Sequence, residues 1–156
     1  MNDRLRRAVE ALHARYLRVI DDDRLEEWPG LFATNGLYRI VTRENFDQKL
    51  PLPIMECRSR GMMEDRVTGL RRINVYEPQR YSHHMSGVEM KEEAHNLVTC
   101  RSNYLVVRIL GDGAVSIFST GVYQDLIRVD DGATVFEERI VIQDSRRVET
   151  LLVIPL

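Results

Sequence analysis

Residues 97–143 read LVTCRSNYLVVRILGDGAVSIFSTGVYQDLIRVDDGATVFEERIVIQ, and this stretch decides the fold. Its long runs are rich in Val, Ile, Tyr and Thr, the residue types that fit best on the pleated surface of a sheet. Gly-Asp-Gly at 111–113 and Asp-Asp-Gly at 130–132 separate the runs, and such pairs of Asp and Gly are typical of hairpin turns. The stretch therefore predicts antiparallel strands. We place the strands over five runs: 81–89, 97–110, 115–129, 134–143 and 148–154.

The chain before residue 78 has mostly helical periodicity. Apolar residues between Leu5 and Ile20 recur three or four positions apart, which places one apolar stripe along a helix. A short helix around Trp28, a strand over 37–41 and a third helix over 61–76 follow. Helices first and long strands afterwards are typical of an α+β arrangement. We therefore expect a single domain over residues 1–156, whose strongly curved antiparallel sheet wraps around the helices and makes a cone-like interior.

Residues 42–60 lose this periodicity. Polar residues alternate with Pro51 and Pro53, and the segment is longer than the loops usually found inside compact domains. A loop of this length is usually disordered, a lid, or an arm that packs on a partner.

Charge and composition exclude several classes of protein. The 22 basic and 24 acidic residues give a net charge of −2, so the chain lacks the excess of positive charge that nucleic-acid binding requires. The longest apolar run, residues 151–156, is far shorter than the roughly 20 residues that a membrane-spanning helix needs. Cys57 and Cys100 cannot build a disulfide framework, so we expect a cytoplasmic protein.

Among the 22 basic residues, Lys49 and Lys91 are the only lysines. Such arginine richness suits a surface packed on another protein, although a genome rich in Arg codons explains it equally well.

The histidines and cysteines do not form a metal-binding motif. His83 and His84 are neighbours on an expected strand, where their side chains point to opposite faces. Neither Cys57 nor Cys100 has a histidine two or three positions later, as a Rieske cluster requires, so we expect no iron–sulfur centre on this chain alone. Motifs for a serine nucleophile, a phosphate loop or a dinucleotide are absent from the sequence as well, and we interpret both cysteines as ordinary thiols.

An acid–base site inside the cone is the enzymatic alternative, because an apolar interior can shift the pKa of a carboxyl or phenol group towards neutrality. The candidates are Tyr16, Tyr38, His83 or His84, and Asp125. Asp125 shares one face of its strand with five apolar residues: Val115, Ile117, Tyr123, Ile127 and Val129. A carboxylate there needs a partner, which Arg101 or Arg139 could supply. Alternatively the ion pair is purely structural, or a bulge at Gly121 turns Asp125 outward.

Six stretches of the chain follow one another in a recognisable order. They are DRLEEWPGLF at 23–32, RENFDQKLPL at 43–52, GMMEDRVTGL at 61–70, YEPQRYSHH at 76–84, GVYQD at 121–125, and residues 137–156 with their Asp-Ser and Ile-Pro-Leu ending. In this order the sequence resembles the small (beta) subunit of aromatic-ring-hydroxylating dioxygenases, the Rieske non-haem iron oxygenases. It is most similar to members that act on aromatic carboxylic acids, such as the small subunits of salicylate hydroxylase and terephthalate dioxygenase.

The resemblance implies the cone-shaped fold of nuclear transport factor 2 (NTF2-like) and of ketosteroid isomerase. It also implies an α3β3 hexamer of large and small subunits, with the small subunits self-associated as a β3 trimer. The large subunit would carry a Rieske 2Fe–2S cluster, a mononuclear Fe(II) and the substrate pocket. It would use O2 and electrons passed from NAD(P)H by a reductase and usually a ferredoxin.

For the small subunit the resemblance implies a structural role, with no catalytic, cofactor-binding or metal-binding residue on this chain. The segments 42–60 and 76–84 are the ones we expect to lie against partner subunits. The interface residues that we predict are Arg80, Tyr81, His83 and Arg101.

Two functions follow from these expectations. We favour the structural subunit of an oxygenase that hydroxylates an aromatic carboxylic acid. The alternative is a stand-alone dehydratase or isomerase of the same fold, with Tyr16, His84 and Asp125 as its acid–base residues. An enzyme of this kind needs an open cavity lined by polar groups, whereas a structural subunit needs a filled cone and an oligomeric face.

Overall fold

The computed structural model describes residues 1–72, 78–147 and 154–156. Its elements in chain order are α1 (Asp3–Asp21), the 3-10 helices η1 (Leu25–Glu27) and η2 (Pro29–Leu31), β1 (Phe32–Thr42), α2 (Arg43–Asp47), β2 (Met55–Cys57), α3 (Arg60–Arg72), β3 (Gln79–Glu92), β4 (Leu97–Leu110), β5 (Val115–Asp130) and β6 (Ala133–Gln143).

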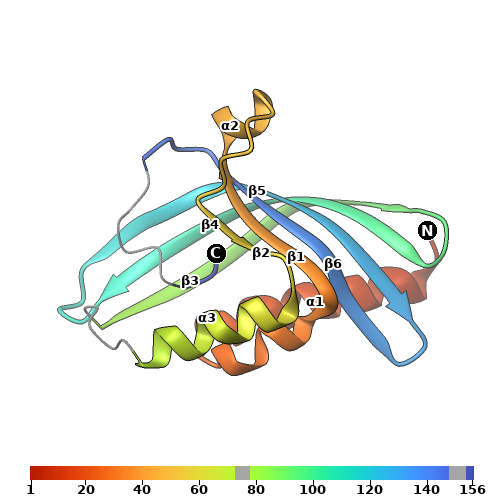
Figure 1. Cartoon of the computed structure of the whole chain (residues 1–156), viewed down its shortest axis with the longest axis horizontal. Helices are drawn as coiled ribbons and strands as arrows, with labels where there is room; N and C mark the ends of the chain where they lie inside the picture. Colours follow the sequence, from red (N-terminus) through yellow and green to blue (C-terminus); the bar gives the residue numbers. More distant parts are fainter. Residues whose placement is uncertain (73–77, 148–153) are drawn as a thin grey trace.

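The described strands form one sheet in the order β2-β1-β6-β5-β4-β3. The sheet arches over α1 and α3, which run along its inner side (Figure 1). The expected α+β class, with helices inside a curved sheet, is confirmed. One pairing differs from the expected antiparallel pattern, because β1 and β6 run parallel. All the other strands lie between these two along the chain, so no hairpin fixes their relative direction.

The predicted apolar stripe holds α1 against the sheet. Asn2 caps this helix by accepting a hydrogen bond from the N–H of Arg4 at 2.8 Å, and Asp3 in the first turn interacts favourably with the helix dipole. The residues that α1 buries are Leu5, Val9, Leu12, His13, Tyr16, Val19 and Ile20. All of them except His13 belong to the predicted stripe, so the helix presents one imidazole to the core.

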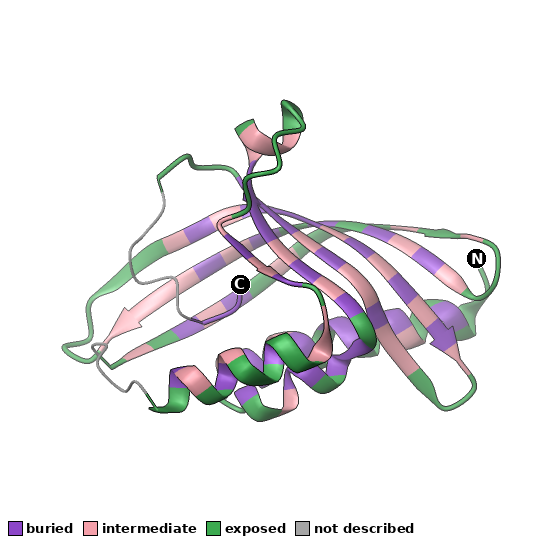
Figure 2. Cartoon of the chain, viewed as in Figure 1, coloured by how far each residue is buried: buried purple, intermediate pink, exposed green. Residues whose placement is uncertain are grey.

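Aromatic rings fill the part of the core where η1, η2 and β1 meet the sheet. The ring centroids of Trp28 and Tyr38 lie 5.0 Å apart in an edge-to-face arrangement, and those of Phe32 and Phe136 lie 5.2 Å apart. Along the strands, buried residues alternate with partly or fully exposed ones, as Figure 2 shows. One face of the sheet therefore lines the main core, and we call the opposite face the outer face.

The segment 42–60, predicted as a loop, contains α2 and β2. The Thr42 side chain starts α2 by accepting a hydrogen bond from the N–H of Asn45 at 3.2 Å. Strand β2 pairs antiparallel with β1, with Cys57 opposite Tyr38. The two elements have only 5 and 3 residues, which is too short for a periodic pattern to indicate them.

Two other predicted elements lie partly outside the described residues. The helix predicted over 61–76 is α3, which is described as far as Arg72. Of the strand predicted over 148–154, only residue 154 is described, and residues 154–156 are all buried. Within the described ranges, no helix combines the length and apolarity that crossing a bilayer requires.

Candidate functional site

Arg139 is the centre of a cluster of charged side chains inside the cone. It lies on β6 directly opposite Asp125 on β5, and its Nε and Nη2 donate to the two carboxylate oxygens at 2.8 Å each. Both side chains are completely buried. Two parallel hydrogen bonds from guanidinium to carboxylate combine charge attraction with a fixed geometry, so the pair has one defined orientation.

Three aromatic rings enclose the guanidinium group of Arg139. Its central carbon lies 4.1 Å from the ring centroid of Tyr16 and 4.2 Å from those of Tyr123 and Phe136. Cation–π contacts of this kind contribute about 2 kcal/mol when the cation is desolvated. The third nitrogen of the same guanidinium group, Nη1 of Arg139, has no hydrogen-bond partner within the described part of the chain.

His13 connects the helix to this ion pair. Its Nε2 donates to Oδ2 of Asp125 at 2.9 Å, and its ring centroid lies 5.9 Å from that of Phe136. The Asp125 carboxylate therefore accepts hydrogen bonds from both α1 and β6, and it ties the helix to the sheet.

The surrounding groups fix the protonation states of this cluster. Burial acts to raise the pKa of Asp125, but the charge and hydrogen bonds of Arg139, together with His13, outweigh it and hold that pKa below its ordinary value. Burial raises the pKa of Tyr16 above its ordinary value, although Arg139 opposes the effect. At neutral pH the cluster is a carboxylate, a guanidinium and a neutral phenol. A carboxylate that already accepts three hydrogen bonds is a poor general base, because it must lose a partner before it can take a proton.

The last residues of the chain fill the space beside this cluster. The N–H of Leu156 donates to the hydroxyl of Tyr38 at 2.9 Å, and the hydroxyl of Tyr16 donates to the carbonyl oxygen of Leu156. The Leu156 side chain has no solvent exposure. Both tyrosines predicted as acid–base candidates, Tyr16 and Tyr38, therefore have hydroxyls that are hydrogen-bonded to the chain's own backbone.

Cys100 completes a group of three side chains of metal-ligating type, together with His13 and Asp125, whose ligand atoms lie within 4.8 Å of one another. The group does not suit a cation. Both carboxylate oxygens of Asp125 are bound by the positively charged Arg139. Burial raises the pKa of the Cys100 thiol to about 12, which makes the thiolate form that a metal needs unfavourable at neutral pH.

The structure brings together two of the three residues predicted for the stand-alone enzyme. Tyr16 and Asp125 both contact Arg139, but His84 is exposed on the outer face of β3, where its Nε2 lies 3.1 Å from the Ser82 hydroxyl. The prediction that His84 joins the cavity is therefore wrong. Successive residues of a strand face opposite sides, and His83 takes the inner position.

One of the two arginines predicted as partners of Asp125 does pair with it. Arg139 forms the ion pair, whereas Arg101 is exposed on the outer face. Because Asp125 is buried, the alternative in which a bulge at Gly121 turns it outward is also wrong.

The four predicted interface residues divide between the two faces of the sheet. Arg80 and Arg101 are exposed, while Tyr81 and His83 are buried in their own subunit. His83 is held there by Asp21, whose carboxylate accepts from its Nδ1 at 2.6 Å. Of these four residues, only Arg80 and Arg101 therefore point outward, as a residue that contacts a partner subunit must.

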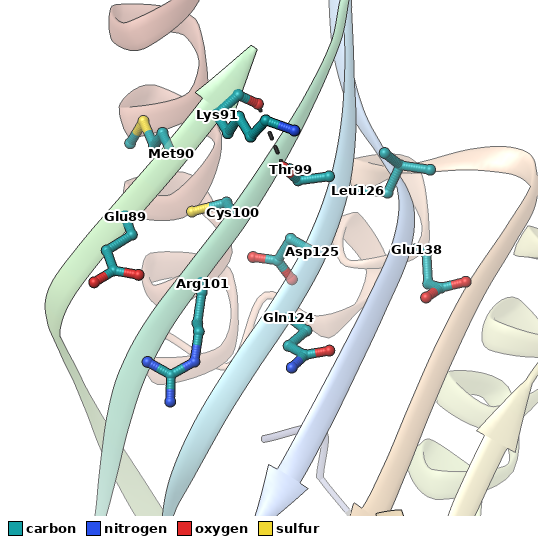
Figure 3. Close-up of a pocket in the computed structure, with 10 residues that line it drawn as sticks. All are labelled: Glu89, Met90, Lys91, Thr99, Cys100, Arg101, Gln124, Asp125, Leu126 and Glu138. Carbon is teal, nitrogen blue, oxygen red and sulfur yellow. Dashed lines mark hydrogen bonds between the residues drawn. The ribbon is translucent and has the colours of Figure 1, made fainter. Parts of the chain in front are cut away.

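Arg101 lines a surface pocket of about 500 Å³ over β3, β4, β5 and β6 (Figure 3). It stands in cross-strand register between Glu89 and Gln124. Acidic, basic and amide side chains therefore share this part of the outer face.

The sequence-based reasoning missed His13 as a member of the buried cluster. A signal was present, because His13 follows Val9 by four positions and precedes Tyr16 by three, which puts it on the apolar stripe. A histidine on the buried face of a helix needs a hydrogen-bond partner, and Asp125 supplies it.

Comparison with known proteins agrees with this architecture. The family model described as "Ring hydroxylating beta subunit" matches residues 14–148. The anthranilate 1,2-dioxygenase small subunit of Burkholderia cepacia is 38% identical over 149 residues, which is 95% of this chain and 92% of that protein. The beta 2 subunit of the terminal oxygenase component of terephthalate 1,2-dioxygenase from a Comamonas species is 31% identical over 148 residues, covering 95% and 96%.

Solved structures extend the comparison to the fold. The beta subunit of a proposed aromatic-ring-hydroxylating dioxygenase from Novosphingobium aromaticivorans superposes with a TM-score of 0.87 and 34% identity, covering 96% of this chain and 95% of that one. A proposed scytalone dehydratase from the same species has a TM-score of 0.68 and 20% identity, covering 89% and 83%, and shows the shared NTF2-like fold alone. The agreement over nearly the whole chain, with identities above 30%, establishes the family: the chain belongs to the ring-hydroxylating beta subunits, the small subunits of aromatic-ring-hydroxylating dioxygenases.

Proposed function

We propose that this chain is the structural small subunit of an oxygenase that hydroxylates an aromatic carboxylic acid, with catalysis residing in the large subunit. The observation that carries the proposal is that the acid–base candidates inside the cone already have partners within the chain. Arg139 and His13 both donate to the Asp125 carboxylate, and the Leu156 backbone occupies the hydroxyls of Tyr16 and Tyr38. An acid–base enzyme of this fold needs those groups for its substrate.

The substrate class rests on the relatives. Anthranilate and terephthalate, which give two of the similar oxygenases their names, are both aromatic carboxylates. The complex would contain three large and three small subunits. The large subunits would hold the Rieske cluster and the mononuclear iron, and a reductase with or without a ferredoxin would supply electrons. We place this complex in the cytoplasm, which keeps the two buried thiols of Cys57 and Cys100 reduced.

Purification of the tagged chain from its own host, with Tyr16→Phe as the variant, tests this proposal. We expect a larger subunit with Rieske absorption to co-purify and the complex to hydroxylate aromatic carboxylates such as anthranilate or terephthalate. Turnover per assembled complex should be the same for Tyr16→Phe as for the natural chain. The proposal fails if the chain purifies alone and colourless and shows dehydratase or isomerase activity that Tyr16→Phe lowers by the roughly 10²- to 10⁴-fold expected for loss of an acid–base group.

A further inference from the structure

Residues 43–54 form a protrusion that we call the arm. It consists of α2 and the segment that leads to β2, and it stands away from the body of the subunit beyond the end of β1 (Figure 1). Most residues of the segment after α2 are exposed (Figure 2).

The arm is held in one conformation by its own hydrogen bonds. The N–H of Leu50 donates to the carbonyl oxygen of Asn45 at 2.9 Å, and the Asn45 side-chain amide donates to the carbonyl oxygen of Leu52 at 3.1 Å. At its base, Arg43 pairs with Asp144 at 2.7 Å. A segment that is already ordered loses little conformational entropy when it binds a partner.

This ordered arm keeps aliphatic side chains in water. Leu50 is 42% exposed and Leu52 is 61% exposed, and each is followed by an exposed proline. Between the arm and the outer face of the sheet lies a groove of about 460 Å³. Its apolar lining includes Val41, Phe46, Leu50, Leu52 and Ile140.

The groove also has a positive charge balance, although the whole chain has a net charge of −2. Arg39, Lys49 and Arg58 line it, and among the described residues of the lining Glu56 is the only acidic one. Glu56 pairs with both arginines at 2.6 Å. One carboxylate therefore faces three cations, and Lys49 has no ion pair with any described residue.

We propose that this groove is the docking site for the large oxygenase subunit, and that it receives a segment of that subunit with an apolar side chain next to a carboxylate. The inference rests on the proposed function, which requires a large subunit. The carboxylate would neutralise the excess positive charge, and the apolar side chain would cover Leu50 and Leu52. A groove that combines aliphatic and charged groups suits two different chains, because interfaces between identical subunits are more apolar.

The test uses the complete complex and exchanges single residues in the arm. Leu52→Asp introduces a charge where the natural side chain is 61% exposed, so the subunit should fold normally. Ile117→Asp is the matched control, because Ile117 is 70% exposed on β5 and lies outside the groove lining. Lys49→Glu tests the charge separately. Circular dichroism and thermal unfolding of each isolated variant verify the fold.

We expect Leu52→Asp to weaken binding to the large subunit by about tenfold or more, as loss of a central interface contact does. Ile117→Asp should leave that affinity unchanged. Lys49→Glu should weaken it too, by a factor that decreases as salt screens the charges. Native mass spectrometry and titration of the large subunit with each small-subunit variant give these affinities.

Three results would overturn the inference, and they have different meanings. If all variants bind the large subunit as the natural chain does, the groove is not the docking site, while the proposed function stands. If Leu52→Asp disrupts only the self-association of the small subunit, the groove receives a second copy of this chain. If the natural chain binds no large subunit at all, both the proposed function and the docking site are wrong.

Discussion

Arg139 depends on Asp125 for its charge balance, because both side chains are completely buried. Removing one partner leaves a buried charge without compensation, whereas removing both does not. We predict that Arg139→Met lowers the free energy of unfolding by about 3–5 kcal/mol. The double variant Asp125→Leu/Arg139→Met should recover most of this loss. Urea unfolding of the natural chain and the variants measures the effect, and an unchanged midpoint for Arg139→Met would contradict it.

The same ion pair predicts how stability depends on pH. Folding holds the pKa of Asp125 below its unfolded value, which is about 3.9. The unfolded chain therefore binds the proton first as the pH falls. The stabilisation is fully present above the unfolded pKa and is lost as the pH falls through the folded pKa.

We therefore expect the natural chain to exceed Asp125→Asn in stability by a constant amount near neutral pH, and this difference to shrink below about pH 4. Urea midpoints of both proteins across the acid range measure the difference. A gap that stays constant down to about pH 2 would mean that folding does not lower the pKa of Asp125.

At the scale of elements, the close approach of β5 and β6 depends on one glycine. A Cβ atom at Gly121 would lie 1.9 Å from the carbonyl oxygen of Ile142, so an alanine there must push the two strands apart. We predict that Gly121→Ala destabilises the fold by at least about 1–3 kcal/mol. Gly69→Ala in α3 is the matched control, because no described residue outside its own stretch of helix has an atom within 4 Å of its Cβ position. That variant should gain about 0.5–1 kcal/mol, and thermal unfolding separates the two results.

The elements also show where sequence patterns stop being informative. Asp125 was grouped with five apolar residues by alternation, and Tyr123, Ile127 and Val129 are indeed buried with it. Val115 and Ile117 are exposed, because an irregularity in the pairing puts Ser119 opposite Val106 but Ile117 opposite Val107. The extra residue reverses the alternation beyond it. A single-residue irregularity of this kind leaves no periodic trace in the sequence.

At the scale of the whole molecule, the fold class was predictable and the contents of the cone only in part. The helical stripe from Leu5 to Ile20 and the long β-rich runs are local patterns, so they indicated helices inside a curved sheet. They also put Tyr16 on the buried stripe and Asp125 on the apolar face of its strand, although an outward turn of Asp125 at Gly121 stayed open. The partnership of Asp125 with His13, and the position of Leu156 at Tyr38, join segments far apart in the chain, which local patterns do not encode.

The parallel pairing of β1 with β6 has a consequence for the kinetics of folding. Strands β3 to β6 can form as a series of hairpins, each closed by a short turn, and β1 can pair locally with β2. The two parts of the sheet join only when β1 pairs with β6, for example at Tyr38 and Arg139. The loop that this pairing closes contains most of the chain. Contacts of such high sequence separation form slowly, because the loop entropy is lost before the contacts compensate for it. We therefore expect the β1–β6 pairing to be the slow step in folding.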